Sequence, residues 1–143
     1  MRNKAKAIKL FWPTVPVSVD AVIIHRGKIV LTKRSIKPYE GYFVFPGGFM
    51  EPGETSKEAC IREAKEECGL DVKITKLIGV FDDPKRDPRG HTLSVAYLCE
   101  SVGGKLKSEK TENSEVKLFS PKEIKKIKLG FDHKHILEEA RLI

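Results

Sequence analysis

The sequence predicts an α/β/α sandwich around a mixed β-sheet. Two observations favour this fold class: β-branched runs lie on both sides of one long helical segment, and a second helical segment follows near the end of the chain. A chain of 143 residues is large enough for one hydrophobic core. No Pro/Ser-rich linker or internal repeat divides it, so we expect residues 1–143 to form a single domain.

The first part of the chain predicts a β-hairpin followed by a short strand and a loop. Residues 15–24 and 28–32 are β-branched runs, and the turn sequence 25–27 separates them. Residues 42–45 are apolar enough for a third, short strand. The prolines and glycines of residues 46–53 are expected to force tight turns, which can bring carbonyl oxygens close to a bound ion.

The second part of the chain predicts further strands and two more helices. We expect strands at 72–81, 92–99 and 116–119, a turn at Gly103-Gly104, and helices at 121–127 and 132–141. Strands therefore precede and follow the long helix, as a layered α/β fold requires.

The long helix is predicted over residues 56–68. Thr55 and Glu58 have the spacing of a capping box, and Gly69 can adopt the left-handed conformation just past the helix end. The expected apolar face consists of Cys60, Ile61, Ala64 and Cys68. Ala59 is expected on the acidic face, where a small side chain leaves room for ions.

Three carboxylates of this helix predict a metal site. Glu63, Glu66 and Glu67 stand at i, i+3 and i+4, so their side chains share one face of the helix. Three like charges this close repel one another, and a hard divalent cation offsets that repulsion. Mg²⁺ is the expected ion and Mn²⁺ is possible, although an ordinary acidic amphipathic helix remains the alternative.

Residues 48–70 resemble a known family signature. They read G-x5-E-x7-R-E-U-x-E-E-x-G-U, where U is aliphatic, and this is the pattern of the Nudix hydrolases at every specified position. The specified residues are Gly48, Glu54, Arg62, Glu63, Ala64, Glu66, Glu67, Gly69 and Leu70. The resemblance implies the same layered fold and metal-dependent hydrolysis of a nucleoside diphosphate linked to another moiety.

The same resemblance implies roles for individual residues. It implies Gly48, Glu63, Glu66 and Glu67 as metal ligands, and Arg62, Glu66 and Glu67 as catalytic residues. Arg62 can pair with Glu58 or Glu66, one helical turn away on either side, and so orient a ligand; an ordinary surface ion pair is the alternative.

Residues 82–91 resemble one branch of the family. Pro84 stands fifteen residues after Gly69, as in the ADP-ribose pyrophosphatase branch, which splits ADP-ribose into AMP and ribose 5-phosphate. Residues 87–91 and 131–133 look like small bacterial and archaeal members of that branch. The candidate substrate-binding residues are Arg34, Pro84, Arg86 and Arg89. For Arg34, a plain surface arginine is the alternative. A plain polar, proline-rich loop is the alternative for residues 82–91.

The sequence is also compatible with other functions. Dinucleoside polyphosphates or non-standard nucleoside triphosphates are alternative substrates. Residues 87–91 and 131–133 also resemble the ADP-ribose-sensing domain of some Nudix-related transcription regulators, so a non-catalytic ADP-ribose-binding module is a further alternative.

A polar segment outside the signature is a candidate catalytic loop. In several Nudix enzymes an acidic residue at about this place approaches the water or a metal, and Glu112 matches that position best. Glu115 is the alternative catalytic acid, and a merely solvated loop over residues 108–114 is the third interpretation.

Composition indicates the expected surroundings and partners. The net charge of +7 suits a polyanionic small molecule such as a nucleotide, but the lysines do not cluster with aromatic residues, so we expect no nucleic acid partner. The sequence contains no apolar run of 18 residues, so we expect no membrane span. Three cysteines are expected to be buried thiols in a reducing cytoplasm. Phe11 and Trp12 are expected to pack in the core or in a possible homodimer, and stacking on a base is the alternative.

Overall fold

The computed structural model describes residues 14–108 and 113–143. Its order of elements is β1 (Val17–His25), β2 (Lys28–Arg34), β3 (Phe43–Val44), β4 (Gly47–Phe49), α2 (Ser56–Cys68), β5 (Leu70–Phe81), β6 (Leu93–Gly104), β7 (Asn113–Phe119), α3 (Pro121–Ile124) and α4 (His133–Glu139). Within the described ranges none of the helices has the length and apolar character needed to cross a membrane.

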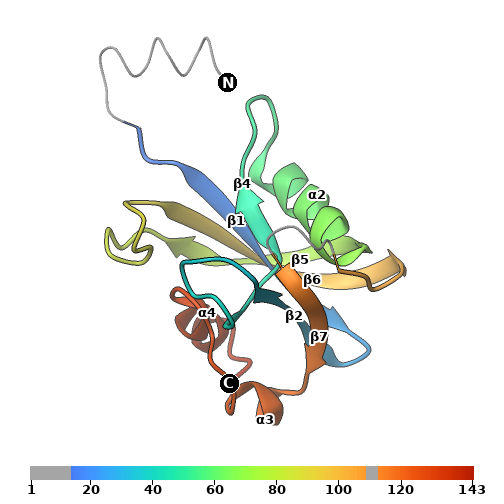
Figure 1. The fold of residues 1–143 in the computed structure, drawn as a ribbon. Coiled ribbons are helices and arrows are strands. Elements are labelled where there is room, and N and C mark those ends of the chain that lie inside the picture. Colours follow the sequence, from blue (N-terminus) through green and yellow to red (C-terminus); the bar gives the residue numbers. More distant parts are fainter. Residues whose placement is uncertain (1–13, 109–112) are drawn as a thin grey trace.

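The strands form a mixed sheet with β1 near its centre (Figure 1). The order along the sheet is β3-β2-β1-β6-β5, while β4 pairs with β1 and β7 pairs with β2. β1 and β6 run parallel, whereas the β1–β2, β1–β4 and β5–β6 pairs are antiparallel. The predicted mixed sheet is therefore confirmed.

The two faces of the sheet bury separate hydrophobic clusters. Val19, Ala21 and Ile23 of β1 pack beneath α2, whereas Val22 points to the opposite face and packs with α3 and α4. This alternation follows from the two-residue period of a strand. Helices cover both faces, so the predicted α/β/α layering is confirmed (Figure 1).

Helix α2 begins and ends as its sequence predicts. The Thr55 hydroxyl accepts a hydrogen bond from the Glu58 backbone N–H at 3.1 Å, and the Glu58 carboxylate accepts one from the Thr55 N–H at 2.9 Å. Gly69 ends the helix in the left-handed conformation, with φ of 78°.

The predicted faces of α2 are wrong at two positions. Ala59 is completely buried in the cluster beneath the helix, and Ile61 is 43% exposed. Residues 59 and 61 lie about 200° apart around a helix that turns 100° per residue. Burial of Ala59 therefore places Ile61 in solvent, and it places Glu63 and Glu67 at the margin of the buried face.

The glycines at 47–48 and 103–104 form strand rather than turns. Gly47 and Gly48 pair with Asp20 and Val19 of β1, and a Cβ at Gly47 would collide with the Val19 carbonyl. Gly103 and Gly104 continue β6 alongside the start of β5. Glycine is needed at Gly47 and Gly104 because another backbone approaches these two positions closely.

The other predicted elements are present with shifted ends. The helices expected at 121–127 and 132–141 are shorter, because α3 ends at Ile124 and α4 spans His133–Glu139. β6 and β7 are longer than expected, since each extends its ladder with a neighbouring strand.

Candidate active site

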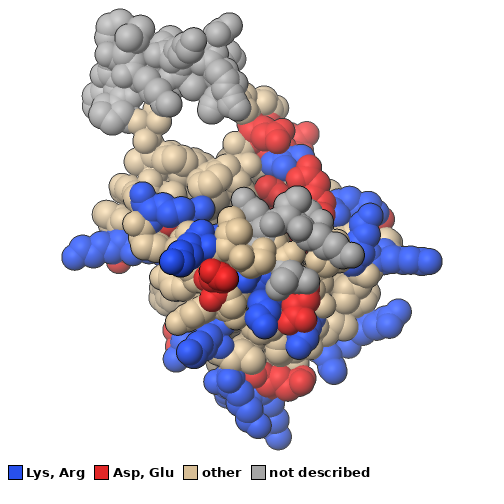
Figure 2. Space-filling view, viewed as in Figure 1, with Lys and Arg blue, Asp and Glu red and all other residues tan. Residues whose placement is uncertain are grey.

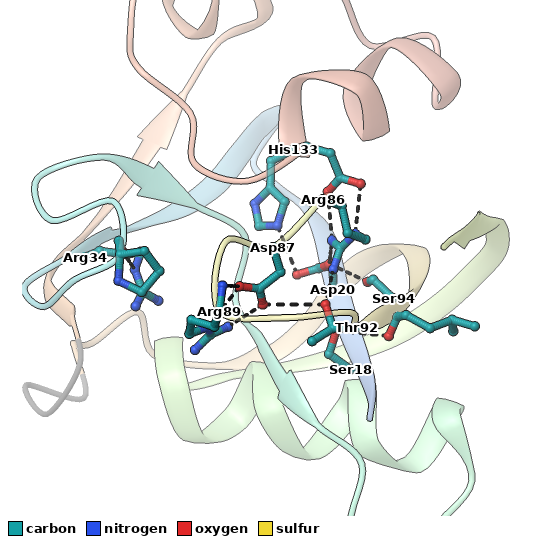
Figure 3. Close-up of polar contacts among 12 residues, drawn as sticks. Ser18, Asp20, Arg34, Arg86, Asp87, Arg89, Thr92, Ser94 and His133 are labelled. Carbon is teal, nitrogen blue, oxygen red and sulfur yellow. Dashed lines mark hydrogen bonds and ion pairs between the residues drawn. The ribbon is translucent and has the colours of Figure 1, made fainter. Parts of the chain in front are cut away.

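A cavity of about 360 Å³ opens beside α2. Its lining comes from β1, β2, β4, α2, the loop between β5 and β6, the start of β7 and the segment before α4. Figure 3 shows how polar side chains from several of these segments meet. Figure 2 shows acidic side chains near α2 and basic side chains spread over much of the rest of this face.

Helix α2 contributes three carboxylates to the cavity. Glu63 and Glu67 are largely buried, whereas the Glu66 side chain is 53% exposed. The Glu67 carboxylate accepts hydrogen bonds from the Gly47 backbone N–H at 3.4 Å and from the Asn113 amide at 3.3 Å. These carboxylates, Glu63, Glu66 and Glu67, are called the carboxylate cluster below.

Gly48 of β4 lies directly against the carboxylate cluster. A Cβ atom at this position would overlap with the carboxylate of Glu63. Glycine at position 48 therefore lets the Glu63 carboxylate lie directly against the backbone of β4.

Arg62 joins the start of α2 to the carboxylate cluster. Its guanidinium donates to both oxygens of Glu54, at 3.0 Å and 2.7 Å, and to Glu66 at 3.2 Å. It also donates to the Phe49 carbonyl of β4 at 3.2 Å. These bonds hold the pKa of Glu54 below its usual value and raise that of Arg62. Glu58 and Glu66 were the two expected partners of Arg62. Glu66 is confirmed, but the second partner is Glu54 rather than Glu58.

Asp20 lies at the floor of the cavity among buried polar groups (Figure 3). Ser94 donates to its carboxylate at 2.5 Å, and Nε2 of His133 lies 3.3 Å away. Nδ1 of His133 accepts from the Phe45 backbone N–H, so a neutral His133 carries its proton on Nε2, toward Asp20. Burial alone would raise the pKa of Asp20, but His133, Ser94 and Arg86 together keep it below its usual value.

Arg86 is buried next to Asp20, with its side chain only 4% exposed. It donates two hydrogen bonds to Asp132, at 2.9 Å and 2.7 Å, and one to Thr92 at 3.0 Å. A bidentate arginine–carboxylate pair has a fixed geometry. Arg86 thus links the loop between β5 and β6 to the residue preceding α4.

Two further arginines approach the cavity from different segments. Arg34, at the end of β2, donates to the Pro38 carbonyl at 2.6 Å. Arg89 is half-exposed, and the buried Asp87 accepts from its Nε at 3.0 Å and its Nη2 at 2.8 Å. Both guanidinium groups also lie over the ring of Phe131.

A model of the NUDIX domain family matches residues 14–140. The chain belongs to this family. The resemblance of residues 48–70 to the Nudix signature is thus confirmed, and so is the expectation of a Nudix hydrolase. The carboxylate cluster, Gly48 and Arg62 all lie in that signature.

Relatives of known name and structure agree with this assignment. The chain is 43% identical to an ADP-ribose pyrophosphatase of Methanocaldococcus jannaschii over 123 residues, which cover 86% of this chain and 71% of the relative. The NUDIX domain of Shewanella oneidensis NrtR, solved with ADP ribose, has the same fold, with a TM-score of 0.81 and 24% identity over 99% of this chain and 97% of that one. A bifunctional NMN adenylyltransferase/ADP ribose pyrophosphatase of Francisella tularensis, solved with AMP and a Mn ion, is 27% identical, with a TM-score of 0.74 over 96% of this chain and 45% of that one.

The donors in this Nudix site suit a hard divalent cation. The carboxylate cluster and the Gly48 carbonyl offer only oxygen, which Mg²⁺ and Mn²⁺ prefer. Among the described residues, no three acidic, histidine or cysteine side chains converge tightly enough to enclose an ion by themselves. A divalent ion bound here would therefore need further ligands, such as substrate phosphates or waters.

The remaining predicted site residues of this Nudix domain are distributed unevenly. Arg34, Arg86 and Arg89 line the cavity, whereas Pro84 is exposed and does not. Glu112, like Phe11 and Trp12, lies outside the described residues. Glu115 does not line the cavity, and its carboxylate lies 3.8 Å from the Lys33 ammonium.

Several residues of the Nudix site were not predicted. Asp20, Asp87, Phe49 and Asn113 all line the cavity. Asp20 carried a signal, because an acid inside an apolar strand needs a buried partner. Asp87 lies in the 87–91 string that resembles one branch of the family, but no role was predicted for it. Phe49 and Asn113 have no local pattern that distinguishes them from ordinary loop or strand residues.

Proposed function

We propose that this protein hydrolyses ADP-ribose to AMP and ribose 5-phosphate. The observation that carries the proposal is the cavity itself, where the carboxylate cluster of α2 and arginines from β2 and the β5–β6 loop line the same space. A metal held by carboxylates and a pair of cations can together neutralise the charge of a diphosphate. The M. jannaschii relative, named as an ADP-ribose pyrophosphatase, supports ADP-ribose as the substrate.

We propose Mg²⁺ as the cofactor, with Mn²⁺ as a substitute. Gly48 and the carboxylate cluster would hold it. When bound, such an ion neutralises phosphate charge and makes water more acidic. The Mn ion in the F. tularensis neighbour supports a divalent ion in this kind of site.

The chain's own side chains divide the remaining tasks. Glu66 or Glu67 accepts the proton of the attacking water, because both lie in the cavity and are acceptors when ionised. Arg62 keeps Glu66 in place through its bonds to Glu54 and the Phe49 carbonyl. Glu112 remains the proposed alternative base.

The four predicted substrate residues act at different distances from the diphosphate. Arg34 and Arg89 contact the diphosphate, since arginine forks match phosphate oxygens. Arg86, already bonded to Asp132 and Thr92, contributes charge from the floor of the cavity and fixes the loop. Pro84 acts from outside the cavity by restricting the conformation of that loop.

The setting of the reaction follows from the cysteines and the ligand class. Cys60, Cys68 and Cys99 are buried free thiols, which supports a reducing cytoplasm. The partner is a small nucleotide, and we propose no role for nucleic acid.

A substrate panel at fixed Mg²⁺, with products separated by chromatography, tests this function. It should contain ADP-ribose, other nucleotide sugars, dinucleoside polyphosphates and nucleoside triphosphates. We expect the highest kcat/KM for ADP-ribose, with AMP and ribose 5-phosphate as products. A clear preference for a triphosphate would overturn the specificity, and tight ADP-ribose binding without any product would indicate a sensor.

A further inference from the structure

Phe131 lies between two arginines that come from distant parts of the chain. The Cζ atom of Arg34 lies 5.4 Å from the centroid of the Phe131 ring, and the Cζ atom of Arg89 lies 5.5 Å from the same centroid. All three residues line the cavity beside the carboxylate cluster. Arginine over an aromatic face is attracted to the ring while its N–H groups remain directed outward from the guanidinium edge.

The backbone of Phe131 is strained. Its φ is 50°, in the left-handed region that glycine and asparagine enter readily and a bulky residue rarely does. Such a conformation is strained and is retained where the surrounding structure requires it. Tyr39, with φ of 62°, is strained in the same way, and its ring lies 4.8 Å from the ring of Phe131.

The neighbours of Phe131 fix its ring in one position. Tyr39 packs against it from the β2–β3 loop, and the His133 ring lies 5.6 Å away. His133 is itself fixed, since Phe45 donates to its Nδ1 and the two rings stack at 4.6 Å. A ring with this many fixed neighbours is a rigid support.

Each arginine is attached to its own segment by oxygen acceptors. Arg34 donates to the Pro38 carbonyl. Arg89 donates to the Asp87 carboxylate (Figure 3). Neither of these attachments connects the two segments to each other. The Phe131 ring lies under both guanidinium groups and so connects them across the cavity. Arg89 also lies over the ring of Phe49, with 5.9 Å between its Cζ atom and that centroid, but Phe49 does not reach Arg34 in this way.

We propose that Phe131 is a positioning residue, which holds Arg34 and Arg89 at the spacing needed to bind a diphosphate group. This deepens the proposed function and rests on it for the identity of the substrate. Phe131 itself makes no bond to the phosphates; it acts through the two arginines. The strain at Phe131 is the cost of placing a ring, rather than a glycine, at this point of the chain.

The test compares Phe131→Leu, Phe131→Tyr and Phe131→Gly with the wild type. The Leu variant keeps apolar volume but removes the ring, and the Tyr variant keeps the ring. The Gly variant removes both the ring and the backbone strain. KM and kcat are measured with ADP-ribose. Binding of methylenediphosphonate, a diphosphate mimic that resists hydrolysis, is measured by calorimetry in Mg²⁺.

We expect the Leu and Gly variants to raise KM and the Kd of the mimic on the order of tenfold, with kcat changed less than about twofold. The Phe131→Tyr variant should keep both KM and the Kd of the mimic close to their wild-type values. Phe81→Leu is the matched control, because its ring contacts His135 outside the cavity, and it should leave both values unchanged. Unfolding midpoints establish that each variant is folded.

Two results would overturn the inference. One is wild-type affinity of folded Phe131→Leu and Phe131→Gly for the mimic; the other is a loss of kcat without a change in KM. Binding of the mimic does not require turnover, so failure of ADP-ribose hydrolysis in the wild type would refute the proposed function and leave this measurement intact.

Discussion

The Arg62 guanidinium donates to both carboxylate oxygens of Glu54, through Nε at 3.0 Å and Nη2 at 2.7 Å. Its remaining nitrogen, Nη1, donates to Glu66. One side chain therefore connects the loop before α2 to the carboxylate cluster within it. A planar fork makes these contacts simultaneously, and an ammonium group cannot.

Replacement of Arg62 by lysine should lower activity while the protein stays folded. Lysine keeps the charge but loses the two-point bond to Glu54 and the bond to Glu66, so Glu66 is less fixed. We expect kcat to fall on the order of tenfold. Steady-state kinetics and circular dichroism check this, and unchanged kcat in Arg62→Lys would contradict the assigned role of the fork.

Replacement of Glu67 or Glu66 by glutamine should nearly abolish hydrolysis. Glutamine keeps size and helix propensity but removes the charge, so kcat should fall by about two or more orders of magnitude. The control is Glu139→Gln on the exposed surface of α4, which should have wild-type kcat. A folded Glu67→Gln protein with normal turnover in Mg²⁺ would refute the assignment.

Gly48→Ala should disrupt the metal site at little cost to the fold. Its methyl group would overlap with the Glu63 carboxylate and displace it. Activity should therefore fall about tenfold or more, and the Mg²⁺ concentration that gives half-maximal activity should rise. Gly79→Ala is the matched control, because a Cβ there meets only the Phe81 ring at an ordinary 3.5 Å. Titration of activity against Mg²⁺ concentration distinguishes the two variants.

Asp20→Asn should destabilise the protein in a pH-dependent way. The pKa of Asp20 is below its ordinary value of 3.8 in the folded state, so its ionised form contributes stability above that pH. The contribution disappears as pH falls through the lowered pKa. At pH 7 the variant should lose about 2 kcal/mol, because His133 and Ser94 lose a charged acceptor at Asp20. Urea unfolding from pH 7 to pH 3 measures the difference, which should shrink toward the acid end.

Glu112→Gln tests the polar segment before β7. If Glu112 accepts the proton, kcat should fall with little change in KM, as expected for an interaction made mainly in the transition state. Glu115→Gln is the comparison, and it should be nearly normal because Glu115 lies outside the cavity. Loss of activity from Glu115→Gln alone would transfer the role, and normal turnover in both would leave the base in α2.

Local signals predicted more of this molecule than long-range ones. The ends of α2 and the signature residues depend on neighbours within a few positions, and Thr55, Glu58 and Gly69 behave as their spacing indicates. The strand at Gly47–Phe49 was not predicted, because its partner is β1 and glycine pairs are typical of turns. Ala59 was predicted to be exposed and is buried, and Ile61 was predicted to be buried and is exposed. The types of side chain alone did not determine which part of the helix faces the sheet.

The polar network around Asp20 shows the same limit. Ser94 and His133 reach Asp20 from β6 and α4, far away in sequence, and no spacing rule connects them. Arg86 was predicted as a cation for the substrate, and its bonds to Asp132 are visible only once the chain is folded.

The parallel pairing of β1 with β6 has a consequence for biosynthesis. Val17 lies opposite Leu93, and both hydrophobic clusters contain residues of β1. During translation from the amino terminus, β1 therefore cannot pair with β6 until β6 has left the ribosome. The nascent chain can pair β1 with β2 and β4 during that interval, but the edge of β1 that faces β6 stays unpaired. Chaperone binding to β1 should therefore be strongest before residue 104 has emerged.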